Sequence, residues 1–138
     1  MKKQVKRKWS DIHDFNIRVD VFMVDVVFVC NANKQQIKKL LEKALGCNYE
    51  KLDMKYLKGW DNSIHRGLMI PFMGGFIVLL KNVDGNFRSF VGIMIHEITH
   101  VVQYLLRDIR VPLNEGTEEV YAYLTEYITN QALLKLYE

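Results

Sequence analysis

One apolar stretch in the second half of the chain limits the possible folds more than any other feature. Residues 87–108 place apolar side chains at helical spacing, so they predict a single long helix that starts at Phe87 or Ser89 and ends near Asp108. The stripe that should face a core consists of Met94, Ile98, Val101 and Leu105. A different, more polar face carries His96, His100, Gln103 and Arg107. The stretch therefore predicts a core helix with a polar face able to support chemistry.

The same helix contains the sequence His96-Glu97-Ile98-Thr99-His100, which is an H-E-x-x-H motif. Residues four apart share one face of a helix, so both imidazoles can bind the same zinc ion. Glu97 lies beside that position and can reach a zinc-bound water as a general base. The chain has only four histidines, and two of them belong to this motif. The motif predicts a hydrolytic zinc centre; the alternative is a helix whose histidines only make hydrogen bonds in the core.

A hydrolytic zinc site usually has three protein ligands and one open position for water. A third ligand must therefore come from another part of the chain. His13, His65 and both cysteines lie upstream, on segments unrelated to the motif. An acidic cluster lies downstream, at the start of the next predicted helix, and consists of Glu115, Glu118 and Glu119. A helix–turn–helix arrangement can fold one of these carboxylates back over the histidine pair.

These two helices together resemble the gluzincin metallopeptidases, in which H-E-x-x-H is followed by a connection and a helix that carries a glutamate. Residues 96–102 are similar to the thermolysin-type active-site helix, and residues 119–123 (Glu-Val-Tyr-Ala-Tyr) resemble the E-x-x-A-(D/N) glutamate helix. Tyr123 departs from the Asp or Asn of that pattern, which leaves open which residue would hydrogen-bond to a zinc ligand and orient it. The resemblance covers about residues 76–130 and suggests the minimal, single-domain gluzincins.

The resemblance implies one zinc ion per chain, bound by His96, His100 and Glu119, with Glu118 as the rival third ligand. Glu97 would take a proton from the zinc-bound water and later pass it to the leaving amine. The reaction also needs a donor for the developing oxyanion. The candidate donors or supporting groups, among which the sequence does not choose, are Tyr104, Tyr121, Tyr123, Tyr127 and His65.

Zincins also bind substrate by backbone pairing with an edge strand that precedes the motif helix. Ile77, Val78 and Leu79 lie in the strand at the matching place. The expected function is a zinc metallopeptidase, an endopeptidase acting on a peptide or protein substrate. One alternative is a zinc amidase or deformylase-like hydrolase that uses Cys47. The other is a non-catalytic zinc-binding zincin scaffold, an accessory protein encoded by a phage or mobile element.

The remaining segments predict an α+β fold. Ile17–Cys30 is rich in Val, Phe and Ile and predicts a strand, although its continuous apolar run at 26–29 indicates burial on both faces or a bulge. Asn33 as N-cap, Gln36 as its capping-box partner and Gly46 as a C-terminal stop predict a helix over Lys34–Leu45.

Two short apolar runs follow, 67–70 and 76–80, and the turn-forming residues between them predict a hairpin. Residues 49–57 are compatible with a strand and a turn. Asn114 or Thr117 should cap a last helix that ends near Leu136. We therefore expect a zincin-like domain over residues 16–138. Its small mixed or antiparallel sheet would pack on the active-site helix, with the C-terminal glutamate helix closing the zinc site.

Composition and charge indicate which partners and which cellular location to expect for this domain. Of the 19 basic residues, five lie within residues 2–8, which leaves 14 against 16 acidic residues in the rest of the chain. We interpret residues 1–15 as a basic, polar N-terminal segment, and one short cluster does not predict nucleic-acid binding. The acidic residues between 11 and 25 argue against a signal peptide, and no run is expected to span a membrane. The expectation is a soluble, cytoplasmic protein whose two cysteines are free.

Overall fold

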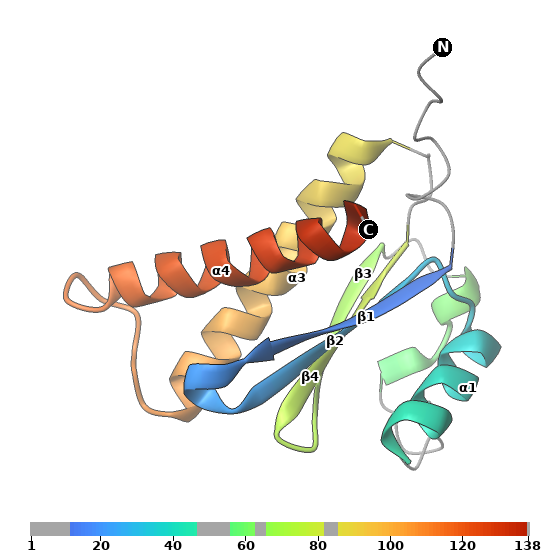
Figure 1. Ribbon diagram of the computed structural model, residues 1–138, viewed down its shortest axis with the longest axis horizontal. Coiled ribbons are helices and arrows are strands. Elements are labelled where there is room, and N and C mark those ends of the chain that lie inside the picture. Colours follow the sequence, from blue (N-terminus) through green and yellow to red (C-terminus); the bar gives the residue numbers. More distant parts are fainter. Residues whose placement is uncertain (1–11, 47–55, 63–65, 82–85, 138) are drawn as a thin grey trace.

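A four-stranded mixed sheet forms the centre of the computed structural model, which describes residues 12–46, 56–62, 66–81 and 86–137 (Figure 1). The strands are β1 (His13–Val19), β2 (Val24–Cys30), β3 (Gly67–Phe72) and β4 (Gly75–Leu80), in the order β1-β2-β4-β3. β2 and β4 are parallel, and both outer pairs are antiparallel. Among the described strands, β1 and β3 are therefore the two edges.

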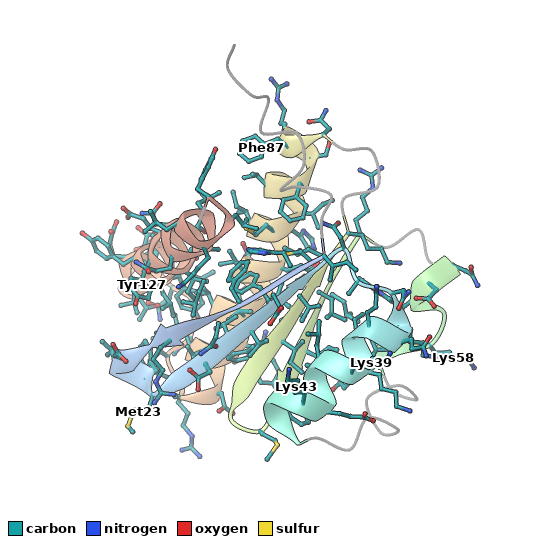
Figure 2. All side chains as sticks on the ribbon, turned by 45° about the vertical axis from the view of Figure 1, so that its right-hand side comes forward. Met23, Lys39, Lys43, Lys58, Phe87 and Tyr127 are labelled. Carbon is teal, nitrogen blue, oxygen red and sulfur yellow. The ribbon has the colours of Figure 1, made fainter. Side chains whose placement is uncertain are left out.

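Helices cover both faces of this sheet. α3 (Phe87–Asp108) and α4 (Glu118–Tyr137) lie on one face, and α1 (Lys34–Leu45) lies on the other (Figure 1). Figure 2 shows Tyr127 on α4 at one side of the sheet and Lys39 and Lys43 on α1 at the other. The mixed sheet and its helices confirm the α+β class.

Alternating side chains explain why β2 is continuously apolar from Val26 to Cys30. Val26 and Phe28 point into the core shared with α3 and α4, whereas Val29 points into a second core with α1. A strand that is buried on both faces needs apolar residues at every position. The prediction of burial on both faces is confirmed for residues 26–29, and no bulge interrupts the register with β1 there.

The helical predictions agree with the structure closely. α1 has the expected bounds; Asn33 and Gln36 form the capping box, and Gly46 ends the helix in a left-handed conformation with φ 57°. α3 runs from Phe87 to Asp108, and its predicted apolar stripe is buried. α4 begins one residue after Thr117. The hairpin predicted around residues 71–75 is also present, as β3 and β4.

The N-terminal strand differs from its prediction. Residues 17–30 do not form one strand; they belong to a hairpin in which a short 3₁₀ turn, Asp20–Phe22, joins β1 to β2. Met23 takes a left-handed conformation with φ 52° at this turn, a role that glycine or asparagine usually fills and that the sequence therefore did not signal. β1 also begins at His13, inside the predicted polar segment 1–15. The predicted strand over 49–57 lies mostly outside the described residues.

α3 is, by length and composition, apolar enough to cross a membrane, which differs from the expectation that no segment is. In the fold its apolar stripe packs against the sheet and α4, where Met94, Ile98 and Val101 are fully buried. A helix that serves as the core of a small domain needs this hydropathy to bury its face.

Candidate active site

His96 and His100 are brought together on the outer surface of α3. Their Nε2 atoms lie 3.1 Å apart, and both side chains are exposed. Two imidazole nitrogens bound tetrahedrally to one zinc at about 2.05 Å would lie about 3.3 Å apart. The same spacing allows a hydrogen bond between one protonated and one bare nitrogen. The spacing of the two nitrogens is therefore compatible with one shared zinc ion.

One flank of α3 carries the chemistry, because residues three and four apart line up along a helix. Ile93, His96, Glu97, His100 and Tyr104 follow this spacing. Ile93 and Glu97 lie directly against Gly67 at the start of β3. The histidine pair is thus placed on the side of α3 that faces the β3 edge of the sheet.

Glu97 is a charged residue enclosed between a helix and a strand. Its side chain is only 6% exposed. Burial raises the pKa of Glu97, and the nearby imidazoles of His100 and His96 act in the opposite direction. A metal cation held by those imidazoles would favour the carboxylate further, since an opposite charge stabilises the ionised form. Glu97 is therefore equipped to exchange a proton beside the histidine pair.

The strand beside this flank is β3, and the expectation for Ile77, Val78 and Leu79 is wrong. These three residues belong to β4, which pairs with β2 on one side and β3 on the other. Because β4 is paired on both sides, these three residues have no backbone edge to which a peptide could add. β3 precedes β4 in the chain, contacts α3 and, among the described strands, pairs only with β4. The edge next to the motif helix is therefore β3.

Glu119 is not brought to the histidine pair. It lies exposed in the first turn of α4, and Figure 1 shows this turn well away from α3. α4 contacts β1, which is the edge of the sheet opposite β3. Within the part of the chain that the structure describes, no group of three or more His, Cys, Asp or Glu side chains could hold a metal. The described fold therefore does not bring Glu119, or Glu118 in the same turn, to the histidine pair.

The hydroxyls of Tyr121 and Tyr127 on α4 bond to backbone groups outside the motif helix. The hydroxyl of Tyr127 donates to the Arg18 carbonyl of β1 at 3.2 Å, and Tyr123 lines the same groove between α4 and the β1–β2 turn. The hydroxyl of Tyr121 donates to the Val111 carbonyl at 2.7 Å. The expected oxyanion or supporting roles of Tyr123 and Tyr127 do not fit these positions, because both side chains lie on the side of α4 that adjoins β1 and the β1–β2 turn.

Tyr104 is the one predicted tyrosine on the correct flank of α3. It follows His100 by one helical turn, and its ring packs edge-on against Phe76 at 5.8 Å. It also borders a cavity of about 440 Å³ between the last turns of α3 and the β3–β4 turn. His65 lies outside the described residues, as does Cys47.

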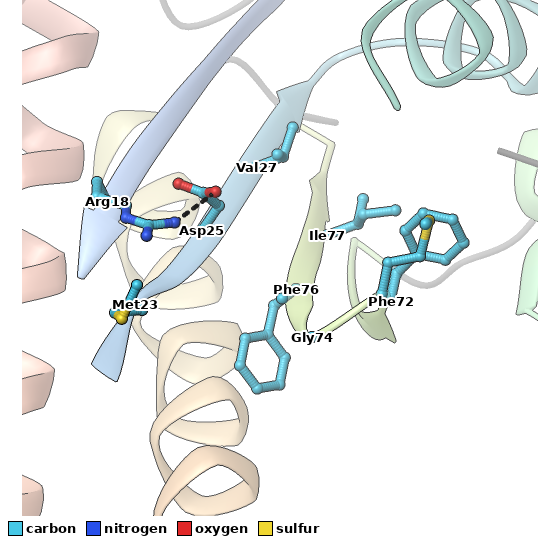
Figure 3. Close-up of a pocket in the computed structure, with 10 residues that line it drawn as sticks. Arg18, Met23, Asp25, Val27, Phe72, Gly74, Phe76 and Ile77 are labelled. Carbon is cyan, nitrogen blue, oxygen red and sulfur yellow. Dashed lines mark hydrogen bonds and ion pairs between the residues drawn. The ribbon is translucent and has the colours of Figure 1, made fainter. Parts of the chain in front are cut away.

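A second cavity, of about 420 Å³, lies on the opposite face of the sheet (Figure 3). Arg18 and Asp25 form an ion pair of 2.9 Å at its wall, and Asn16 also donates to Asp25. These polar groups satisfy one another, and the lining contains no histidine or cysteine. Its chemistry is structural, so the motif flank of α3 stands as the candidate site.

In comparisons with protein-family models, curated proteins and solved structures, no family, protein or structure matched this chain.

Proposed function

We propose that this protein is a zinc-dependent peptidase with a zincin-like fold, in which His96 and His100 bind the metal and Glu97 is the general base. The observation that carries the proposal is the 3.1 Å separation of the two Nε2 atoms beside a buried carboxylate. Two neighbouring imidazole nitrogens beside a buried acid whose pKa is raised are groups that metal-assisted hydrolysis uses.

Bound zinc would lower the pKa of water and polarise the carbonyl under attack. Glu97 would accept the proton of the attacking water on its carboxylate and then donate it to the departing amine. Its enclosure between α3 and Gly67 keeps the carboxylate from turning into solvent. Tyr104, one turn beyond His100 on the same flank, is the described side chain best placed to donate to the developing oxyanion.

β3 supports the proposed peptide substrate. An edge strand presents a row of unpaired backbone groups, to which an extended peptide can add as a further strand. The strand starts at Gly67, against Glu97, so a peptide paired with β3 would pass close to the general base. Pro71, which lacks a backbone N–H, lies in this strand and limits pairing at its far end.

The resemblance to gluzincins implies Glu119 as the third zinc ligand, yet the first turn of α4 does not bring this carboxylate to the histidine pair. This observation favours a second candidate function, in which the chain is a zincin-like scaffold that binds zinc through two histidines without turnover. A soluble, cytoplasmic location is part of either proposal.

Elemental analysis of the purified protein tests the metal site. We expect one zinc per chain in the wild type, loss of zinc in His96→Ala and His100→Ala, and retention in His13→Ala, which removes a histidine of β1. Absence of zinc from the wild type after zinc addition would overturn both functions.

Catalysis is tested separately with a peptide library and mass spectrometry. The peptidase proposal expects cleavage by the wild type and none by Glu97→Gln, with zinc retained in that variant. Zinc binding without cleavage of any peptide would favour the scaffold.

A further inference from the structure

A second apolar stripe runs along α4 next to the buried one, and its first half borders the groove at the β1–β2 turn, where the Tyr127 hydroxyl donates to the Arg18 carbonyl. The buried stripe of this helix is Tyr121, Leu124, Ile128, Ala132 and Leu136. The exposed stripe consists of Val120, Tyr123, Tyr127, Leu134 and Tyr137, with Asn130 at the remaining position. Tyr123, Leu134 and Tyr137 are 68%, 60% and 59% exposed. A single helix that is apolar on two faces has more apolar surface than its own domain covers.

The exposed stripe has the spacing of a helix–helix seam. Its six positions, from Val120 to Tyr137, are separated by three, four, three, four and three residues. This is the alternation of the a and d positions in paired helices, sustained over about 26 Å of helix. One asparagine among such positions is typical of a seam in which a polar residue sets the register. The stripe therefore fits another helix better than a flat or irregular partner.

We propose that α4 pairs in an antiparallel manner with α4 of a second copy of this chain. The spacing reads the same in both directions, so a two-fold axis near residues 128–129 places every stripe residue opposite another. Val120 then faces the partner's Tyr137, Tyr123 faces the partner's Leu134, and Tyr127 faces the partner's Asn130. A contact of this isologous kind closes on itself and gives a dimer.

The charges of α4 favour the antiparallel direction. Glu118, Glu119 and Glu126 lie in its N-terminal half, and Lys135 lies in its C-terminal half. An antiparallel copy keeps the three glutamates of one helix apart from those of the other, whereas a parallel copy would set them against each other. The helix dipoles also oppose each other favourably in the antiparallel pair.

A groove beside the stripe provides further space for the second copy. It has a volume of about 510 Å³ and lies between α4 and the β1–β2 turn, with Val21, Phe22, Val120 and Tyr123 among its walls. Val21 at its rim is 87% exposed. In the antiparallel pair, the aromatic ring of the partner's Tyr137 is adjacent to Val120 and can enter this groove. The groove thus offers an apolar site for this ring in the proposed dimer.

The histidine pair is not part of this contact, because both histidines lie on the outer surface of α3 and the contact is made by the stripe on α4. The proposal is therefore independent of zinc binding and of peptide cleavage. Glu97→Gln should leave the dimer unchanged.

Sedimentation equilibrium of the full chain tests the interface. We expect a dimer at micromolar concentration in the wild type, and a dissociation constant raised at least about tenfold by Tyr123→Glu or Leu134→Glu. Ala122→Glu is the matched control, since it adds the same charge at an exposed position of α4 outside the stripe. Circular dichroism should show all three variants folded, because the changed residues are exposed. A wild type that is monomeric throughout, or a dimer insensitive to both stripe variants, would overturn the proposal.

Cross-linking tests the direction of pairing. In a Cys47→Ser background, mixed Tyr123→Cys and Leu134→Cys chains should be joined to each other by a short bismaleimide. Cys30 is buried and should not interfere. Tyr123→Cys chains that cross-link only among themselves would show a parallel pair, or a different surface, and would contradict the antiparallel arrangement.

Discussion

The backbone of Gly67 at the start of β3 lies directly against the side chain of Glu97 in α3. A Cβ atom at Gly67 would lie 2.8 Å from Cγ of Glu97, 2.9 Å from its Oε1 and 2.8 Å from Cγ2 of Ile93. These distances are shorter than real Cβ contacts, so any side chain at position 67 must displace the carboxylate or separate β3 from α3. The glycine thereby fixes how closely the edge strand approaches the proposed general base.

Gly67→Ala should destabilise the fold by about 1–3 kcal/mol, because the new methyl group overfills the contact. Urea denaturation measures this change. Gly92→Ala is the control: Gly92 lies inside α3 with open space around its Cβ position, and alanine there should stabilise the helix by about 1 kcal/mol. If the proposed peptidase activity is found, Gly67→Ala should also lower turnover while zinc is retained. Equal stability of Gly67→Ala and wild type would contradict the close approach.

Glu119→Ala and Glu118→Ala should leave the affinity for zinc unchanged. Both carboxylates lie in the first turn of α4, apart from the histidine pair. Zinc titration with a competing chromophoric chelator measures the dissociation constant, with His100→Ala as the variant that should lose binding. A large loss of affinity in Glu119→Ala alone would show that α4 relocates when the metal binds and would restore the gluzincin ligand set.

Tyr104→Phe should lower kcat on a confirmed peptide substrate by about 10²-fold, the usual effect of removing one oxyanion donor. KM should change little, because the ring and its packing on Phe76 remain. Tyr127→Phe should have no effect on kcat, since that hydroxyl donates to the Arg18 carbonyl at the far edge of the sheet. The reverse pattern would move the oxyanion site to α4.

Cys30 should resist alkylation in the folded protein. Burial, reinforced by the charge of Asp14, raises the pKa of its thiol from 9.0 to about 12. The thiolate is the reactive form, so iodoacetamide at pH 8 should label Cys30 only after unfolding, as followed by peptide mass mapping. Rapid labelling of the native protein would contradict its burial.

The same thiol should make stability fall at high pH. Above pH 9 the unfolded chain releases the Cys30 proton, while the folded chain keeps it until about pH 12. The unfolded state therefore binds fewer protons in this window, and the free energy of unfolding decreases as the pH rises. Denaturation between pH 8 and 10.5 should show a smaller decrease in Cys30→Ala than in the wild type. An identical slope in both proteins would rule out this contribution.

The helices and the hairpin that were predicted correctly from the sequence depend on local interactions. The bounds of α1 follow from a capping box between Asn33 and Gln36 and from a left-handed Gly46, all of which act within a few residues. The course of α3 and the pairing of its two histidines follow from helical periodicity alone. Likewise, the β3–β4 hairpin follows from two apolar runs around a short turn.

Contacts between distant segments decided the strand order, the position of α4 and the division of the first strand. The order of the strands made β3 an edge and placed Ile77, Val78 and Leu79 inside the sheet, although β4 has the more apolar sequence. α4 packs against both α3 and β1, with Glu119 exposed in its first turn and Tyr127 bonded to β1 rather than placed beside the histidine pair. A short acidic turn and the positive φ of Met23 split the first strand in two. These outcomes depend on which surfaces bury one another across the fold, and spacing along the chain does not encode that choice.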